Sequence, residues 1–269
     1  MLVSNAIASG LLAALLLATT PVNAAGAGDE ADRYALVIGN GAYDAAPLRN
    51  PPNDARDVAR KLRRIGFEVQ LELDLDRAAF DRALDDFFAA IADGDAVVLV
   101  FYAGHAVQLR DRNYLLPVDA HFDSVEDLRS ATLPLQHVFD RLDGLGTHRN
   151  LLILDACRDN PFVDDEDEDL AELPAGLAPV EAPPGTLVAY ATEPGSYAGD
   201  GRGRNGTYSK HLLRHLGEQK PVEDVFRRVR QGVVRETRGE QVPWEHSSLL
   251  ESLYIHPRQN VRVPPVNVF

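Results

Sequence analysis

Continuously apolar runs alternate with segments of helical periodicity along most of the chain. Residues 96–102 and 151–154 contain no charged side chain, as expected of strands that are buried on both faces. The first run breaks at Ala103-Gly104-His105-Ala106, and the second ends at a polar cluster. Between such runs, apolar residues recur every three or four positions, which is typical of amphipathic helices. Residues 67–73 instead alternate apolar and polar positions, which predicts an outer, less buried strand.

This pattern predicts an α/β fold. The expected strands are 34–38, 67–73, 96–102, 150–156, 186–191 and 253–255. The expected helices are 55–65, 77–92, 135–142, 208–216 and 222–237, with Asn53 or Asp54 capping the first and Asp76 the second. Because strands and helices alternate, we expect right-handed crossovers and a mostly parallel central sheet with helices on both faces.

The first 24 residues have a different character. Residues 7–18 form a short apolar stretch, and Val22-Asn23-Ala24 offers small residues where a signal peptidase cuts. We therefore expect a signal peptide over 1–24 and an exported protein, periplasmic or secreted, although no Lys or Arg precedes the stretch. The alternative is an uncleaved anchor, but about a dozen apolar residues are fewer than the roughly 20 that span a bilayer.

Composition narrows the range of partners and cofactors. The formal net charge of −14 argues against nucleic acid and anionic membrane surfaces as partners. The spacing of four cysteines that binds zinc and the Gly-rich loop that binds phosphate are both missing, so we expect no metal and no cofactor. His211 and His215 are four residues apart, but no third ligand stands near them.

Two residues with nucleophile and base chemistry stand at the ends of the predicted central strands. Cys157, the only cysteine, follows one strand, and His105 follows another and precedes Cys157 by 52 residues. If these strands are parallel neighbours, both side chains emerge at the carboxyl edge of the sheet, where ligands bind in open α/β folds. A thiol needs a base because only the thiolate attacks, so the pair predicts nucleophilic catalysis. The alternative is a buried, structural cysteine.

Phe101-Tyr102-Ala103-Gly104-His105, followed by Asp155-Ala156-Cys157-Arg158, resembles the caspase-like cysteine peptidases (peptidase family C14), in particular bacterial metacaspase-type relatives. In caspases the histidine also precedes the cysteine by about 50 residues. The resemblance covers 33–257 as a peptidase domain and leaves 258–269 as a tail. Supporting segments are Ile38-Gly39-Asn40, Asn53-Asp54-Ala55, Asn113-Tyr114-Leu115, Asp159-Asn160-Pro161-Phe162 and Pro243-Trp244-Glu245.

The resemblance implies a caspase-like three-layer αβα sandwich and an endopeptidase that acts on proteins or peptides. Cys157 would be the nucleophile and His105 the general base. The backbone N–H groups of Cys157 and Ala106 would stabilise the oxyanion. Asp54 and Asp155 would bind the substrate side chain and favour cleavage after Arg or Lys, because carboxylates are the natural partners of guanidinium groups. Calcium dependence occurs in metacaspases, but the acidic residues here indicate no particular calcium site.

Two positions depart from the family pattern. Ala106 stands where the family usually has glycine, and Asp159 stands where caspases carry glycine two residues after the cysteine. If position 106 needed a positive φ, alanine would distort the oxyanion site. The competing hypothesis is therefore a weakly active or inactive relative that binds peptides or serves as a scaffold. Asp54 could equally be only a helix cap, and Trp244 either core or pocket wall.

The segment 163–184 should be a surface linker between parts that resemble the large and small caspase subunits. It contains six consecutive acids at 164–169 and then a Pro- and Ala-rich run, a composition that does not pack into a core. From Asp159 through Gly201 there is no Lys or Arg. An enzyme that cuts after basic residues could not cut itself there. The Gly-rich stretch 195–206 suits a loop that lines the substrate site.

Overall fold

The computed structural model describes residues 31–92, 94–157, 173, 176–193 and 203–257. The expected signal peptide, the acidic run 164–169, most of the linker and of loop 195–206, and the tail 258–269 lie outside the described residues. The strands are β1 (Arg33–Gly39), β2 (Glu68–Leu73), β3 (Val97–Leu109), β4 (Arg112–Leu115), β5 (Leu133–Pro134), β6 (Asn150–Cys157), β7 (Thr186–Tyr190) and β8 (Trp244–Ser247). The helices are α1 (Pro51–Arg64), α2 (Arg77–Ala89), α3 (Val125–Ala131), α4 (Gln136–Leu145), α6 (Thr207–His215) and α7 (Val222–Thr237).

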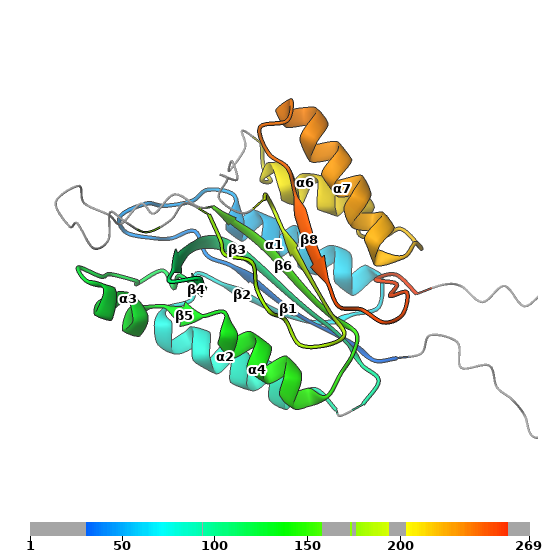
Figure 1. Cartoon of the computed structure of the whole chain (residues 1–269), viewed down its shortest axis with the longest axis horizontal. Coiled ribbons are helices and arrows are strands. Elements are labelled where there is room, and N and C mark those ends of the chain that lie inside the picture. Colours follow the sequence, from blue (N-terminus) through cyan, green and yellow to red (C-terminus); the bar gives the residue numbers. More distant parts are fainter. Residues whose placement is uncertain (1–30, 93, 158–172, 174–175, 194–202, 258–269) are drawn as a thin grey trace, which may run out of the picture.

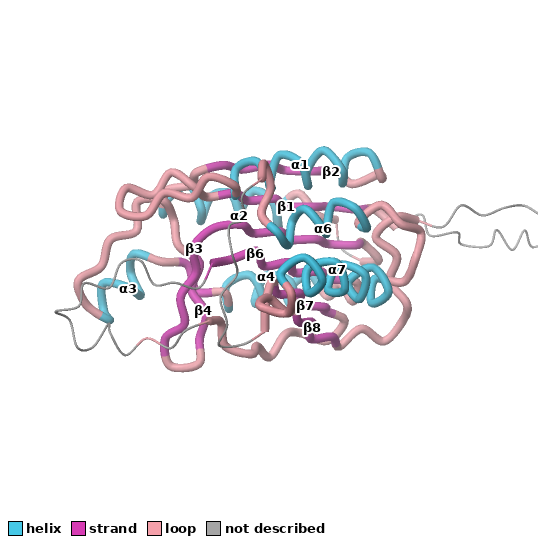
Figure 2. The backbone as a smooth tube through the Cα atoms, turned by 90° about the horizontal axis from the view of Figure 1, so that it is seen from above, coloured by secondary structure: helices cyan, strands magenta, loops and turns pink. Residues whose placement is uncertain are grey.

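The main sheet has the strand order β2-β1-β3-β6-β7-β8, in which only β8 runs antiparallel to its neighbour. Helices α1, α6 and α7 cover one face, and α2 and α4 cover the other (Figure 1). The view from above shows the strands lying beneath α1, α6 and α7 (Figure 2). The α/β prediction and the three-layer sandwich are thus confirmed. No described helix is long and apolar enough to cross a membrane.

Successive residues of the central strands contribute to opposite cores. On β3, Leu99 and Phe101 pack beneath α1, α6 and α7, whereas Val98 and Val100 pack against α2 and α4. These side chains are at most 1% exposed. Each contributes about 1.5–3 kcal/mol by leaving water. Burial on both faces explains why the central strands read as unbroken apolar runs.

Two local predictions agree with the structure. β2 pairs only with β1, and its residues are exposed or half-buried, as its alternating pattern indicated. Asp76 is the N-cap of α2, where its carboxylate accepts a hydrogen bond from the Ala79 N–H at 2.6 Å. Both features depend on short-range pattern, which explains why the sequence alone revealed them.

The start of α1 was predicted wrongly. The helix begins at Pro51, and its N-cap is Asn50, so neither Asn53 nor Asp54 is a cap. Two prolines open the helix, where their fixed φ suits the first turn and their missing N–H groups are not needed. Asp54 instead lies inside the first turn and is only 2% exposed. A buried carboxylate in this place needs a partner, and α6 provides one, as described below.

The final strand was also predicted wrongly. β8 is Trp244–Ser247, whereas Tyr254 makes only an isolated bridge to Pro221. Leu253 and Ile255 fill the core beneath the helices. Because they are two residues apart, they gave the alternating pattern that is typical of a strand. β8 has no apolar alternation because it is an edge strand, and its Trp244 is 49% exposed. Trp244 is therefore not a core residue.

Candidate active site

The structure sets His105 and Cys157 on neighbouring strands at the same level of the sheet. β3 and β6 are parallel, and their register pairs His105 with Cys157 at the last rung. Contrary to the prediction, β3 does not end before His105. It continues to Leu109 and pairs antiparallel with β4 from Ala106 onward. His105 thus marks the point where β3 leaves the parallel sheet, which gives it support from two directions.

Two tyrosines hold the backbone of His105. The hydroxyl of Tyr43 accepts a hydrogen bond from the His105 N–H at 2.9 Å. The hydroxyl of Tyr102 donates to the His105 carbonyl at 2.6 Å. The two hydroxyl oxygens lie 3.3 Å apart, and each also approaches the carbonyl of Leu116 at 3.1 Å. Because all these groups are buried, each bond is costly to lose.

Gly104 is required for this arrangement. Its φ is +156°, and a Cβ at this position would lie 2.7 Å from the Tyr43 hydroxyl and 2.8 Å from the Tyr102 hydroxyl. Both distances are shorter than real Cβ contacts, so any larger residue would displace the tyrosines that hold His105. Packing against the two tyrosines therefore explains why the residue before His105 is glycine.

The imidazole of His105 has a defined orientation. Its Nε2 lies 2.8 Å from the carbonyl oxygen of Ala46, and its ring packs against Tyr43 with ring centroids 4.5 Å apart. A carbonyl oxygen can only accept, so Nε2 carries the proton in this contact. In the neutral ring Nδ1 is then the nitrogen that can take up a proton. The residue is 3% exposed, so the ring has little freedom to turn.

Ala106, which replaces the usual glycine, is free of backbone strain. It is not among the described residues with a positive φ, and it pairs with Leu115 of β4 in regular strand geometry. Its side chain is 2% exposed within the core cluster beneath α2 and α4. The distortion that a positive φ would impose on alanine is therefore absent.

The two predicted specificity residues both contact the first turn of α6. Asp54, on α1, accepts hydrogen bonds from the Gly206 N–H at 3.2 Å to each of its carboxylate oxygens. Asp155, on β6, accepts a hydrogen bond from the Ser209 hydroxyl at 2.5 Å. Gly206 is the N-cap of α6, so both carboxylates face the positive end of its dipole. The structure thus brings Asp54 and Asp155 to one short stretch of backbone.

Tyr208 lies between these contacts in the sequence and is 1% exposed. Within the described part of the chain, its hydroxyl has no hydrogen-bond partner. Burial raises the pKa of Tyr208 well above the usual value for a tyrosine, and the nearby charge of Asp155 raises the pKa further. The phenol therefore stays neutral at every physiological pH and close to the Asp155 carboxylate.

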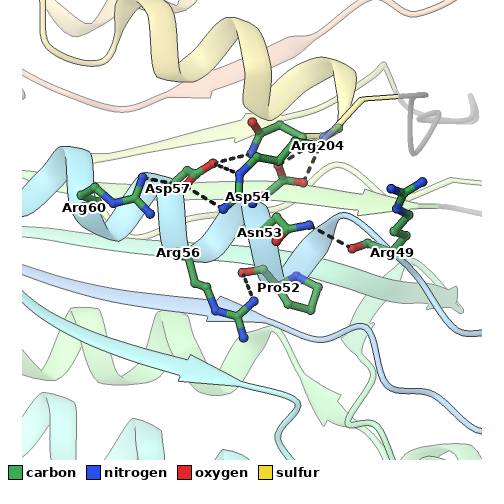
Figure 3. A network of polar contacts seen from close by, with 10 residues as sticks. Arg49, Pro52, Asn53, Asp54, Arg56, Asp57, Arg60 and Arg204 are labelled. Carbon is green, nitrogen blue, oxygen red and sulfur yellow. Dashed lines mark hydrogen bonds and ion pairs between the residues drawn. The ribbon is translucent and has the colours of Figure 1, made fainter.

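A second polar network ties the loop before α6 to α1 (Figure 3). Asp57 pairs with Arg204 at 3.0 Å, accepts a hydrogen bond from Asn205 at 3.1 Å, and pairs with Arg60 at 2.8 Å. Partial burial alone would raise the pKa of Asp57, but these bonds outweigh it and hold the pKa below its usual range. Since Gly206 follows directly, the network helps to fix the N–H that Asp54 binds.

Several of these residues carried no signal in the sequence. Any residue offers a backbone carbonyl, so nothing in the pattern distinguished Ala46. Tyr43 lies in an irregular loop, and Ser209 lies inside a predicted helix. The histidines considered for metal binding contact carboxylates instead, His211 with Glu236 and His215 with Glu218. In the described residues no group of three ligands could hold a metal ion.

Comparisons with known proteins identify the family of this chain. The family model for the caspase domain, peptidase family C14, matches residues 32–254. Mucosa-associated lymphoid tissue lymphoma translocation protein 1 of Homo sapiens is 29% identical over 227 residues, which are 82% of this chain and 26% of that protein. Its homolog in Mus musculus matches equally well. The chain therefore spans about a quarter of the length of these curated relatives.

Among solved structures, the crystal structure of protein GSU0716 from Geobacter sulfurreducens has a TM-score of 0.59 to this chain at 17% sequence identity. The match covers 85% of this chain and 98% of that one, and at this identity it concerns the fold alone. The family match spans most of the sequence and every residue of the site described above. The chain belongs to the caspase domain family, peptidase family C14.

Proposed function

We propose that the protein is a cysteine endopeptidase that cleaves after Arg or Lys by means of a His105–Cys157 dyad. The observation that carries the proposal is the register of β3 and β6, which sets these two residues at the same rung of parallel strands. The hydrogen bond from Nε2 of His105 to Ala46 adds to it, because it leaves Nδ1 as the proton acceptor.

The reaction proceeds in two halves. His105 takes the thiol proton, and the Cys157 thiolate attacks the carbonyl carbon of the scissile peptide bond. The tetrahedral intermediate expels the amine, which receives the proton from His105, and a thioester remains. Water then attacks the thioester while His105 again acts as base, and the acid product and free thiol are released.

Backbone N–H groups of Ala106 and Cys157 stabilise the oxyanion in this proposal. Each donor in such a site typically contributes about 10²–10³ in rate. The unstrained backbone of Ala106 supports this role, because an alanine in regular geometry presents its N–H as a glycine would. The replacement of the usual glycine by Ala106 is therefore a weaker reason to doubt activity.

The proposed preference for Arg or Lys rests on Asp54 and Asp155. Two carboxylates near one turn of α6 form an acidic site that suits a guanidinium or an ammonium group. Substrates ending in Asp would place like charges together and bind poorly. No metal or other cofactor takes part in the proposed chemistry.

Fluorogenic peptides that end in Arg, Lys, Asp or citrulline test the proposal. Citrulline has nearly the shape of arginine but no charge, so it separates the acidic pocket from simple steric fit. We expect cleavage after Arg and Lys, little after citrulline, and none after Asp. Cleavage should fall at least ~10³-fold in Cys157→Ala and His105→Ala. Assays with calcium and with a chelator show whether the activity depends on calcium.

His121→Ala serves as the matched control, because this histidine is exposed and pairs with an exposed carboxylate, Asp123. It should leave activity unchanged. Equal cleavage after Arg and citrulline would contradict the acidic pocket and leave the dyad intact. Failure to cleave any peptide, in wild type and Cys157→Ala alike, would favour a peptide-binding domain without activity.

A further inference from the structure

A basic pocket opens between α6 and α7, which lie side by side in both views of the molecule (Figures 1 and 2). It has a volume of about 370 Å³, within the range of small-molecule sites. Its lining residues include neither His105 nor Cys157, and neither Asp54 nor Asp155. The residues that define this α6–α7 pocket are His211, Arg214, His215, Arg228, Arg235 and Glu236.

The floor of the α6–α7 pocket is a buried, oriented histidine. His211 is 5% exposed, and its Nε2 donates to Glu236 at 2.8 Å. Its Nδ1 lies 3.4 Å from a guanidinium nitrogen of Arg214. Since arginine can only donate, Nδ1 acts as an acceptor and the ring is neutral. Burial lowers the pKa of His211, in agreement with this tautomer.

Gly232 of α7 makes the pocket possible. A Cβ at this position would lie 2.2 Å from Nδ1 of His211, so only glycine lets the imidazole lie against the α7 backbone. The pocket is therefore a built feature with a fixed floor and not a loose gathering of surface arginines. Its shape depends on one glycine and one buried ring.

The charge of the α6–α7 pocket is positive, although the whole chain carries −14. Three guanidinium groups face one carboxylate among the lining residues. That carboxylate, Glu236, already contacts Lys210 and His211. Among the residues that the structure describes, no carboxylate lies within ion-pair distance of Arg214 or Arg235, and Arg228 reaches Glu218 only at 3.5 Å.

We propose that the α6–α7 pocket binds the phosphate group of a small anionic molecule. Guanidinium groups offer planar pairs of donors that fit phosphate oxygens, and three arginines line this one pocket. The volume exceeds that of one phosphate ion, which favours a phosphorylated small molecule over the free ion. The proposal does not depend on peptidase activity, because it concerns residues outside the dyad and the acidic site.

Calorimetric titration of the full chain carrying Cys157→Ala tests this directly. The probes are inorganic phosphate, pyrophosphate and glycerol 3-phosphate, with acetate as a singly charged control. We expect saturable binding to one site, weakened by added salt. Tighter binding of glycerol 3-phosphate than of inorganic phosphate would identify an esterified ligand, and the reverse order would identify the free ion.

Variants distinguish binding in this pocket from non-specific attraction to positive charge on the surface. Arg214→Gln and Arg235→Gln should each weaken binding about tenfold, the loss expected for one charge-assisted hydrogen bond. Arg227→Gln is the matched control. Arg227 is an exposed arginine of α7, the helix that carries Arg235, and it pairs with Asp224 outside the pocket. It should change binding by less than about twofold. Gly232→Ala should abolish binding by displacing His211.

If Gly232→Ala does not fold, Arg214→Gln and Arg235→Gln still test whether the pocket binds phosphate. Absence of saturable phosphate binding would overturn the proposal. So would unchanged affinity in Arg214→Gln and Arg235→Gln, or an equal loss in Arg227→Gln. Binding of an acidic peptide but of no phosphate compound would also overturn it, and would indicate a protein-docking surface.

Discussion

At the scale of single residues, His105 shows how few contacts fix the position of a buried side chain. Tyr43 and Tyr102 hold its backbone, and the Ala46 carbonyl orients its ring. The sequence indicated His105 through the motif before it and through its spacing to Cys157. It could not indicate Ala46, because a carbonyl is common to all residues. The role of Tyr43 depends on a loop whose path no local pattern predicts.

Tyr43→Phe tests this support. The change removes the acceptor of the buried His105 N–H but keeps the ring that packs against the imidazole. An unsatisfied buried donor costs about 1–3 kcal/mol, so the free energy of unfolding should fall. If the proposed dyad is correct, kcat should fall about tenfold, whereas KM should change little because the Tyr43 hydroxyl acts on the backbone of His105 and Leu116.

Tyr34→Phe is the control for this variant, since it makes the same chemical change on β1 away from His105. Steady-state kinetics and urea unfolding measure the two effects separately. Wild-type kcat in Tyr43→Phe would contradict the positioning role, whatever the effect on stability.

At the scale of elements, α6 connects the sheet to α1. Its N-cap binds Asp54, its first turn binds Asp155, and the residues just before it bind Asp57. The sequence predicted the helix and proposed both acidic residues through the family resemblance. The meeting of these groups required the tertiary structure, because Asp54 and Gly206 are 152 residues apart in the chain.

Asp57→Asn probes this connection through pH. The pKa of Asp57 is lower in the folded chain than the ordinary value, so the unfolded chain takes up a proton more readily than the folded chain does. The stabilisation is therefore fully present above the ordinary pKa and is lost as pH falls through the lowered one. The difference in unfolding free energy between wild type and Asp57→Asn should shrink as pH falls from about 6 to about 3.

Chemical denaturation at several pH values measures this difference. Asp123→Asn is a suitable control, because Asp123 is exposed and pairs with an exposed histidine, His121. A difference that stays constant over the whole acid range would show that the Arg204–Asp57 pair does not stabilise the folded state.

At the scale of the whole molecule, the distribution of basic residues constrains processing. The stretch from Asp159 through Gly201 has no Lys or Arg, although it spans the region where caspase-like enzymes are often divided into two subunits. We predict that the active protein keeps this stretch intact, because an enzyme that cuts after basic residues finds no site there.

Denaturing electrophoresis of an active sample shows whether the chain is cut. N-terminal sequencing of any fragments shows where. An uncut chain across the stretch is expected, with any self-cleavage after Arg202, Arg204 or basic residues elsewhere. A new N-terminus inside 163–184 would contradict the prediction, and would also count against the proposed specificity if it vanished in Cys157→Ala.

The sequence by itself determined the α/β class and most of the elements, because burial on both faces of a sheet demands unbroken apolar strands. It also indicated His105 and Cys157 as candidate site residues, which lie at the same rung of neighbouring strands in the structure. It misplaced the last strand, because Leu253 and Ile255 fill the core from an irregular segment. Only the tertiary structure decided the continuation of β3 past His105, the contact with Ala46, and the meeting of α6 with Asp54 and Asp155. These features join segments far apart in the chain, and their free energy comes from contacts that no local pattern encodes.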